Sequence, residues 1–533
     1  MSLGNVQHFK IIRDAVHLDI EFDQDEIRII NTREFQRLRR IRQLGLAYLV
    51  FPSATHSRFE HVLGVCCMAQ KIIDSINRLQ PETISMAERK IIRYLALLHD
   101  IGHLPFGHTL EDERPTIVEK HDGQERLNHF LFKSSIADEI QRAEREFGLD
   151  DARNQLIGIL CATKKGGDKK ARALKAREKL YADIVGNTIC ADLLDYLKRD
   201  TLFTGIQHRY DERIVSSFRT DTDQLYIDLT DDRSIRTGLV SEILHMLRLR
   251  YTLGERVYYH RTKAAASGML SKAFELLNLQ AEDLYDLGDD ELLFLMENPA
   301  AIESKITKTR EVPQELKEAV RGIVAKIRKR ALYQPVYRIT RSVADEKHQK
   351  SHLVEAYHDP KNILKRKQLE DDLIQECELK PGQVIIYCPD AEMSLKEAEV
   401  KVRFSSKAPL EILKAVSERN IKDDIAALEE KHKSLWALEV FVDPDIVVAR
   451  GQRIAAVCQD RLCGLDNDIE AYRASSMEAI AYQSLFQAIE RTNKDYSQVP
   501  SLIGSMHKVG SSKLNTSDKW IAAFPDKFEK KLL

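Results

Sequence analysis

The sequence predicts a mainly α-helical protein with a smaller α+β region toward its C-terminal end. Two patterns support this fold class. Apolar residues recur every three or four positions through most of the first 280 residues, which is the spacing of one helix face. Short runs rich in β-branched and aromatic residues, which are typical of strands, occur mainly after residue 380.

The predicted helices of the N-terminal half follow one another closely. The first covers residues 33–44, where Phe35, Leu38 and Ile41 lie three apart and Thr32 can cap the helix. Further helices are predicted over residues 57–77, 87–99, 183–203 and 236–280.

The predicted elements change in kind after residue 300. Charged helices are predicted at 301–333 and 341–375, and short strands at 383–388, 400–404 and 438–443. One further short strand is predicted earlier in the chain, at 224–229. We therefore expect two parts. Residues 1–335 form the larger part, with its core at about 30–265, and residues 336–533 form an α+β region of uncertain role.

The composition narrows the class of protein. The 533 residues are 43% hydrophobic, and Lys plus Arg (81) nearly balance Asp plus Glu (83), so whole-chain charge does not indicate a nucleic-acid or membrane partner. No run of 18 apolar residues is present and the N-terminus has no apolar signal core, so we expect neither a membrane span nor secretion. The eight cysteines form no Cys-x-x-Cys pair, which fits a reducing cytoplasm.

A basic segment, ATKKGGDKKARALKAREK, occupies residues 162–179. It is interpreted either as a solvated insertion or as a patch that attracts polyphosphate or nucleic acid, because clustered Lys and Arg attract phosphates. The sequence leaves both interpretations open.

Histidine is concentrated where metal or acid–base chemistry is first sought. Seven of the 17 histidines fall within residues 56–129. His61 lies on one predicted helix, the pair His99-Asp100 closes another, and Asp192 begins a third. Imidazole and carboxylate ligands suit a divalent ion such as Mn, Fe, Mg, Zn, Ni or Co. A four-ligand set leaves positions free for water and a phosphate oxygen, as a catalytic metal requires.

The segments around these residues resemble a known family. FQRLRRIRQLGLAYLVFPSATHSRFEHVLGV (35–65), LLHDIGHLPFGH (97–108) and ADLLDYLKRD (191–200) are similar to the dNTP triphosphohydrolase branch of the HD superfamily. That branch includes bacterial dGTPases and a vertebrate enzyme that joins a sterile-alpha-motif domain to an HD domain. The resemblance covers residues 10–265. It implies an HD-domain helical core, a homo-oligomer, and hydrolysis of a dNTP to a deoxynucleoside and inorganic triphosphate.

The resemblance also implies roles for individual residues. The metal ligands would be His61, His99, Asp100 and Asp192. The catalytic group would be His121, with His103 and Glu111 beside it. The substrate would be bound by Gln43, Leu44, Arg58, His108, Tyr196, Asp200, Arg250 and Tyr258. Ordinary core packing is the alternative interpretation for Tyr196 and Tyr258.

Three departures from the family pattern affect these expectations. Leu193 stands where a phosphate-binding Lys is frequent, and Glu111 replaces a usual Asp. Gln36 and Arg39 match an activator-nucleotide pocket of some members, but the Asp that reads guanine there is Asn31 here. An amide donates where a carboxylate only accepts, so the sequence leaves an activator nucleotide open without favouring guanine.

Two other functions remain open. The missing Lys at position 193 is compatible with an HD phosphatase or phosphodiesterase that acts on nucleoside monophosphates or on cyclic or signalling nucleotides. The basic segment and the long C-terminal region are compatible with a nucleotide- or nucleic-acid-binding regulator that has weak turnover.

Overall fold

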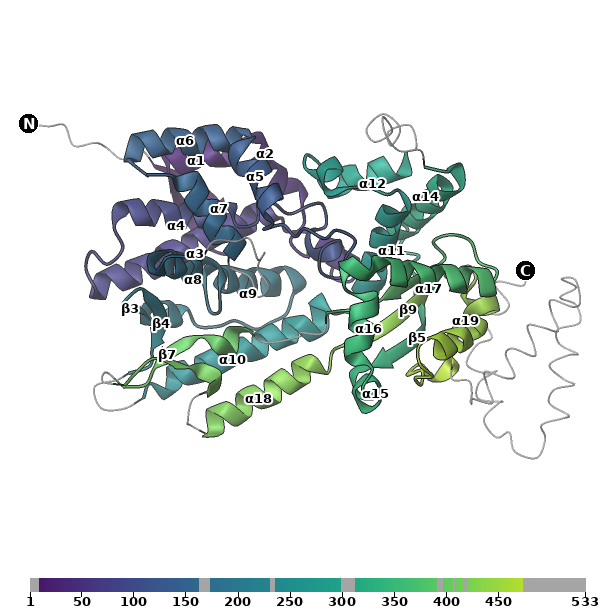
Figure 1. Cartoon of the computed structure of the whole chain (residues 1–533). Coiled ribbons are helices and arrows are strands. Elements are labelled where there is room, and N and C mark those ends of the chain that lie inside the picture. Colours follow the sequence, from purple (N-terminus) through teal and green to yellow (C-terminus); the bar gives the residue numbers. More distant parts are fainter. Residues whose placement is uncertain are drawn as a thin grey trace, which may run out of the picture.

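The computed structural model describes residues 9–162, 173–230, 235–298, 312–390, 396–405, 408–415 and 419–472. Most of the basic segment 162–179 and the end of the chain from residue 473 lie outside the described residues. Helices dominate, with small sheets at three places, so the predicted mainly α fold is confirmed (Figure 1). Among the described residues, no helix is both long and apolar enough to cross a lipid bilayer.

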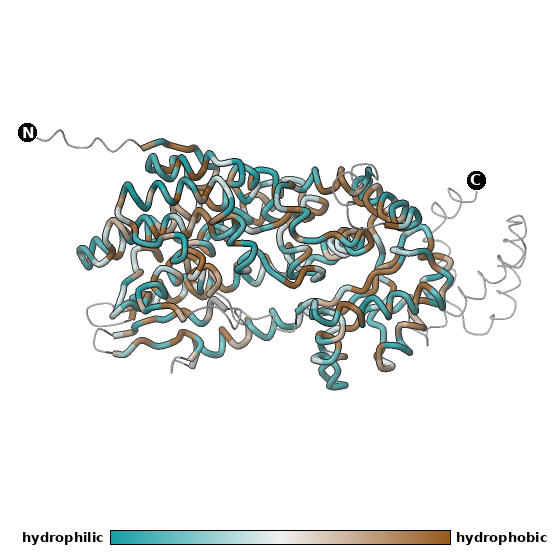
Figure 2. The backbone as a smooth tube through the Cα atoms, turned by 45° about the horizontal axis from the view of Figure 1, so that its top comes forward, coloured by the Kyte–Doolittle hydropathy of each residue, from teal (hydrophilic) through white to brown (hydrophobic). Residues whose placement is uncertain are grey.

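The larger part of the chain is a bundle of helices around α3, which packs against α4, α8 and α9. Along these helices hydrophobic and hydrophilic residues alternate, as expected when one face is buried (Figure 2). The helices of this part are α1 (Gln24–Ile30), α2 (Arg33–Gln36), α3 (Arg58–Leu79), α4 (Met86–Leu98), α5 (Gln124–Phe132), α6 (Ser135–Phe147), α7 (Ala152–Ala162), α8 (Ala176–Gly186), α9 (Ala191–Thr204), α10 (Thr237–Leu253), α11 (Arg261–Leu276), α12 (Asp289–Glu297) and α14 (Gln314–Arg328).

An antiparallel hairpin that the sequence analysis did not predict precedes the bundle. Its strands are β1 (Phe9–Asp14) and β2 (Leu18–Asp23). The Asp14 carboxylate accepts hydrogen bonds from the backbone N–H groups of Val16 and His17, at 2.9 and 2.8 Å, and so fixes the turn. The hairpin turn thereby directs His17 into the bundle.

The single helix predicted over residues 33–44 is wrong in its second half. Helix α2 ends at Gln36, a 3-10 turn covers Arg37–Arg40, and Arg42 forms an isolated bridge with Ser57. Buried Arg37 donates to the carbonyls of His103 and Ile101, at 2.8 and 2.7 Å, which ties this turn to the loop after α4. The early end of the helix lets Gln43 and Leu44 face a cavity.

Two other predicted helices are interrupted near the same cavity. The stretch 183–203 is divided between α8 and α9, so Asp192 lies in the first turn of a new helix. The stretch 236–280 is divided by a π-helical turn, η5 (Gly254–Tyr258), between α10 and α11. A π-helical turn adds a residue to the helix and changes which side chains face one side.

The C-terminal region is α+β, as expected. Its antiparallel sheet has the order β5 (Gln334–Thr340), β9 (Ala437–Val442) and β6 (Val384–Tyr387). Every residue of β9 is buried. Near this sheet lie α15 (Arg341–Glu346), α16 (Lys350–Tyr357), α17 (Ile363–Glu376) and α19 (Val447–Arg461). Helix α18 (Arg419–Lys433) lies apart from them.

The C-terminal region packs closely against the helical bundle. Strand β7 (Lys401–Arg403) pairs in parallel with β4 (Gln224–Asp228), which belongs to a hairpin with β3 (Phe218–Asp221). A further short strand, β8 (Glu411–Ile412), continues the same sheet. Helix α18 packs against α10, and both lie side by side in Figure 1. Residues far apart in the sequence can therefore share one site.

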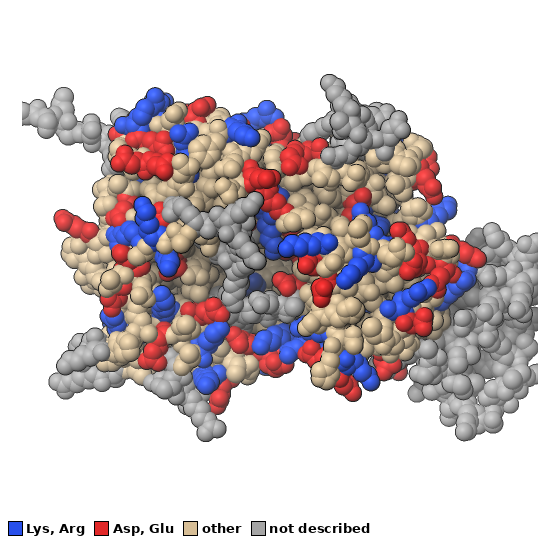
Figure 3. Space-filling model, in the orientation of Figure 1, with Lys and Arg blue, Asp and Glu red and all other residues tan. Residues whose placement is uncertain are grey.

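Buried charged residues join the two regions. Glu275 of α11 and Glu370 of α17 lie among Arg114, Lys272 and Arg366, with side chains at most 6% exposed. Arg114 also donates to the carbonyl of Ile386 in β6, at 2.9 Å. On the face drawn in Figure 3, by contrast, Lys and Arg are interspersed with Asp and Glu.

Candidate active site

A cavity of about 560 Å³ lies between the helical bundle and the C-terminal region. Its lining includes the following residues predicted from the sequence: Gln43, Leu44, Arg58, His61, His99, Asp100, His103, His108, His121, Asp192, Tyr196, Asp200, Arg250 and Tyr258. Glu111 is the predicted site residue that does not line it, because its side chain is buried behind His121.

Three helices bring the expected metal ligands together. His61 lies in the first turn of α3, His99 is the C-terminal cap of α4, and Asp192 lies in the first turn of α9. One donor atom from each of these three residues lies within 4.8 Å of the other two. His61 Nε2 is 3.0 Å from Oδ1 of Asp192, and His99 Nε2 is 3.9 Å from the same oxygen.

Asp100 lies beside this trio. Its two carboxylate oxygens are 3.8 Å from His61 Nε2 and 3.5 Å from His99 Nε2. Asp100 also accepts a hydrogen bond from Arg58. Burial would raise the pKa of Asp100, but Arg58, His99 and His103 hold it well below its ordinary value, so the carboxylate is ionised.

Neighbouring groups fix the orientation of both histidine rings. His61 Nδ1 is 2.7 Å from Oδ2 of Asp195, and His99 Nδ1 is 2.8 Å from the carbonyl oxygen of Ala96. Each ring therefore directs Nε2 toward the trio, which is the arrangement in which a second partner orients a metal-binding imidazole.

Asp195 is itself held by several buried groups. His17 Nε2 lies 2.8 Å from Asp195 Oδ1, and Arg199 donates to both oxygens of Asp195 at 2.8 Å. Arg199 also donates to Asp14 in the hairpin turn, at 2.9 Å. A Cβ on Gly64 would lie 1.9 Å from Asp195, so α3 can approach α9 here only with glycine.

The donor set fits a divalent cation. Two imidazole nitrogens and the Asp192 carboxylate converge, with Asp100 beside them, and His99 Nε2 is buried without a hydrogen-bond partner among the described residues. A buried nitrogen in that state is costly unless it has a ligand. We therefore expect His61, His99, Asp100 and Asp192 to be able to hold a metal ion such as Mn, Fe, Mg, Zn, Ni or Co.

A second histidine cluster adjoins this set. The rings of His103 and His121 stack at 3.8 Å, and His103 Nε2 is 3.3 Å from Asp100. His121 Nδ1 is 3.2 Å from Glu111, whose other oxygen accepts from Arg126. Burial and the charges of Arg58 and His121 lower the pKa of His103 well below its ordinary value, so this ring is neutral. His108, at the cavity edge, is bonded to Asp112 at 2.6 Å.

Two arginines face the cavity. Arg58 leaves Nε and Nη2 without partners among the described residues, although its side chain is only 1% exposed. A Cβ on Gly107, where φ is +55°, would lie 2.5 Å from Nη2, so glycine leaves space for this guanidinium. The Arg250 guanidinium lies 5.6 Å from the Tyr196 ring and 4.9 Å from the Tyr258 ring.

A hydrogen-bonded group continues the site beyond Tyr196. The Tyr258 hydroxyl donates to Asp200 at 2.6 Å, and His56 Nε2 is 2.9 Å from the other oxygen of Asp200. Asp192, Tyr196 and Asp200 are four residues apart, so they share one face of α9.

The residues expected at an activator pocket bond to each other. Arg39 Nε donates to Gln36 at 2.8 Å, and its guanidinium lies 3.5 Å from the Phe59 ring. Gln36 donates to the carbonyl of Ile30 at 2.7 Å, and neither residue lines the cavity.

Several residues that support or line the site are not among those predicted from the sequence. Asp195 stands in the same segment as Asp192, three residues later, and this spacing was a usable signal. Arg199 follows Asp195 by four residues on α9, which is also a usable spacing. His17 has no comparable signal, because it reaches Asp195 only after the hairpin folds onto α9. Tyr387, Pro389, Asp390 and His432 line the cavity from the C-terminal region.

The chain is similar in sequence to known proteins over the segment that carries this site. Residues 58–200, from Arg58 to Asp200, match the family model of the HD domain. The chain is 32% identical over 293 residues to an uncharacterized protein, MJ1154, of Methanocaldococcus jannaschii, covering 52% of this chain and 53% of that protein. It is 30% identical over 332 residues to the deoxynucleoside triphosphate triphosphohydrolase SAMHD1 homolog of Dictyostelium discoideum, covering 61% of this chain and 59% of that protein. The chain thus spans between half and three-fifths of the length of these relatives.

A solved structure supports the fold. A hypothetical protein from Aquifex aeolicus superposes with a TM-score of 0.58 at 21% identity, covering 84% of this chain and 99% of that one. The family match spans the segment in which α3, α4 and α9 bring two histidines and two aspartates together. From this match we conclude that residues 58–200 of the chain form an HD domain.

Proposed function

We propose that the protein is a metal-dependent phosphohydrolase that converts deoxynucleoside triphosphates to deoxynucleosides and inorganic triphosphate. The observation that carries this proposal is the convergence of His61, His99 and Asp192 in one cavity with Arg58 and Arg250. The name of the Dictyostelium relative supports the choice of substrate.

His61, His99, Asp100 and Asp192 would hold the metal ion. When bound, a divalent ion polarises a phosphate oxygen and lowers the pKa of a coordinated water, which becomes a nucleophile near neutral pH. The Arg58 guanidinium, two of whose nitrogens have no partner among the described residues, and Arg250 would bind phosphate oxygens through paired hydrogen bonds.

His121 would protonate the leaving 5′-oxygen. Imidazole is a common general acid, and the Glu111 carboxylate 3.2 Å from Nδ1 orients the ring so that Nε2 faces away from it. Glu111 and stacked His103 would then be positioning residues for His121. His108, at the cavity edge, would contact the phosphates.

The groups beyond Tyr196 would bind the sugar. Asp200 orients the Tyr258 hydroxyl, and the Tyr196 ring lies 5.6 Å from the Arg250 guanidinium. Gln43 and Leu44 would complete the sugar pocket, and Gln43 Oε1 is buried without a partner among the described residues. A ring packed against the sugar would disfavour a 2′-hydroxyl.

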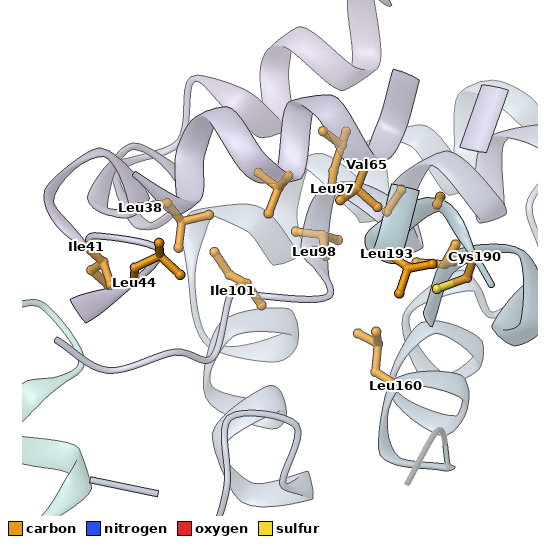
Figure 4. Packing of buried hydrophobic residues seen from close by; sticks show 14 of the residues in the cluster. Leu38, Ile41, Leu44, Val65, Leu97, Leu98, Ile101, Leu160, Cys190 and Leu193 are labelled. Atoms are coloured by element: carbon orange, nitrogen blue, oxygen red, sulfur yellow. The ribbon is translucent and has the colours of Figure 1, made fainter. Parts of the chain in front are cut away.

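A second substrate class has specific support. Leu193 is 2% exposed and packs with Cys190 and Leu160 in the apolar core, so it supplies no phosphate-binding group (Figure 4). Asp and Glu outnumber Lys and Arg in the cavity lining. Both features favour a substrate less charged than a triphosphate, such as a nucleoside monophosphate or a cyclic or signalling nucleotide.

The proposal extends to the location of the enzyme, its assembly and its activator. We propose that it acts in the cytoplasm as a homo-oligomer. An activator nucleotide would contact Gln36 and Arg39.

A hydrolysis screen tests the proposed function. The full chain, supplied with Mn, Fe, Mg, Zn, Ni or Co, is incubated with the four dNTPs, their ribonucleotide counterparts, nucleoside monophosphates and cyclic dinucleotides, with and without a second nucleotide. We expect inorganic triphosphate from dNTPs, and no activity from the His99→Ala variant. Release of only inorganic phosphate from monophosphates, or of no product from any dNTP, would contradict dNTP hydrolysis.

A further inference from the structure

The C-terminal region forms one wall of the candidate active site. Tyr387 ends β6, Pro389 and Asp390 follow it, and His432 lies in the last turn of α18. All four residues line the cavity, although they lie more than 180 positions beyond the end of the HD-domain match. The C-terminal region is therefore placed to contact whatever the metal site binds.

His432 carries an unused polar atom at this wall. Its residue is 2% exposed, and its Nδ1 is buried without a hydrogen-bond partner among the described residues. A Cβ on Gly254 would lie 3.1 Å from the ring, so the π-helical turn makes room for the imidazole with a glycine. A buried nitrogen without a partner is unfavourable, which points to a partner that a ligand supplies.

The contacts of His432 are with residues around Arg250 and Tyr259. Tyr196 lies one helical turn after Asp192, and Arg250 lies 5.6 Å from the Tyr196 ring. His432 lies near enough to Arg250 for the guanidinium charge to lower its pKa, and its ring is 5.9 Å from the Tyr259 ring. A phosphate chain held at the metal and the arginines would leave the other end of the ligand near His432.

The charge state of His432 suits an uncharged ligand group. Burial and the nearby Arg250 lower the pKa of His432 to about 4, so the ring is neutral at physiological pH. A neutral imidazole offers one donor and one acceptor, which matches the edge of a nucleobase better than it matches a phosphate.

The loop beside His432 is held in place. The carbonyl of Pro389 accepts from Nε1 of the buried Trp436 at 3.1 Å, and His358 Nδ1 lies 2.9 Å from the carbonyl of Cys388. Trp436 follows His432 by four residues, so the loop and the end of α18 are tied together. A wall fixed in this way can discriminate between ligands at little ordering cost.

We propose that His432 and the loop Tyr387–Asp390 form a nucleobase subsite, in which a nitrogen of the His432 imidazole hydrogen-bonds to the base edge. The proposal rests on the proposed function, because it assumes that the ligand is a nucleotide. It gives the C-terminal region a role in substrate choice.

The test compares hydrolysis with phosphate binding in the metal-loaded full chain. His432→Phe keeps a ring of similar shape and removes both nitrogens, and His352→Phe is the control at an exposed histidine of the same region. We expect His432→Phe to lower kcat/KM at least tenfold for the preferred dNTP and to reduce the differences among the four bases. The Kd of inorganic triphosphate, measured by calorimetry, should change less than twofold.

A second variant tests the proposal in case His432→Phe does not fold. Gly254→Ala keeps the imidazole but displaces it, and we expect the same loss of base discrimination. Unchanged ratios among the bases in both variants, or an equal loss of inorganic triphosphate binding, would overturn the subsite while wild-type dNTP hydrolysis still stands. If the wild-type chain hydrolyses no nucleotide, the proposed function fails and the subsite fails with it.

Discussion

His61 Nδ1 lies 2.7 Å from a carboxylate oxygen of Asp195, and both side chains are buried. This contact extends the site beyond its expected ligands. Through Asp195 it reaches Arg199, His17 and the hairpin turn, so the first strands of the described chain help to fix the ring of His61.

The first prediction concerns Asp195. Asp195→Asn should weaken metal binding by about 10- to 100-fold, because loss of an outer partner of a metal-binding histidine has effects of that size. Calorimetric titration of the metal into the metal-free chain measures the Kd directly. The matched control is Asp74→Asn, at an exposed aspartate of α3. Equal affinities for Asp195→Asn and the wild-type chain would contradict the role of Asp195.

Arg58 provides the second prediction. Its guanidinium donates to Asp100 and has two nitrogens without a partner in the described part of the chain, whereas Lys cannot make paired hydrogen bonds. Arg58→Lys should therefore reduce kcat/KM for the preferred nucleotide by about 100-fold. Steady-state kinetics at saturating metal separates this effect from weaker metal binding. A reduction of less than about threefold would mean that Arg58 does not bind the phosphates.

Tyr258 provides the third prediction. Tyr258→Phe removes the hydroxyl that donates to Asp200 but keeps the ring beside Arg250. We expect the preference for dNTPs over the ribonucleotides to fall by about 5- to 10-fold, because one hydrogen bond contributes about 1 kcal/mol. The ratio of kcat/KM values for each dNTP and its ribonucleotide measures this change. An unchanged ratio would mean that the Tyr258 side chain only packs against its neighbours and does not bind the sugar.

The sequence predicts the helices that carry the site because the apolar residues that these helices bury recur with the helical period. The helix predicted over 57–77 is α3, and that over 87–99 is α4. The strands at 383–388 and 438–443 are equally apparent, because β6 and β9 are buried on both faces and read as continuous apolar runs.

Long-range contacts explain what the sequence does not predict. The helix over 33–44 ends early because Arg37 bonds to carbonyls more than 60 residues away. His432 gives no local signal, since it reaches the cavity only when α18 packs on α10. Local patterns thus identify the expected ligands, while the cavity wall and the outer partners depend on the tertiary fold.

Leu193 provides the fourth prediction. Because its side chain lies in the apolar core (Figure 4), Leu193→Lys should lower the free energy of unfolding by roughly 2 kcal/mol or more, the scale of burying an unpaired polar group. Urea denaturation measures this loss, and Leu193→Met is the control of similar volume. A stable Leu193→Lys variant that binds inorganic triphosphate more tightly would show instead that position 193 can reach the phosphates.

Glu275, between the two regions, gives a prediction about pH. Burial would raise the pKa of Glu275, but Arg114, Arg366 and Lys272 lower it to about 2 from an ordinary value of 4.5. A lowered carboxyl pKa contributes stability that is present above pH 4.5 and lost as the pH falls toward 2. Glu275→Gln should therefore lower the free energy of unfolding at pH 7 by about 3 to 5 kcal/mol, because it leaves buried cations unpaired. In urea denaturation the difference from wild type should shrink from pH 4.5 downward, whereas the exposed control Glu282→Gln should change little at any pH. A difference that stays constant down to pH 2 would mean that the ionised Glu275 carboxylate does not stabilise the junction.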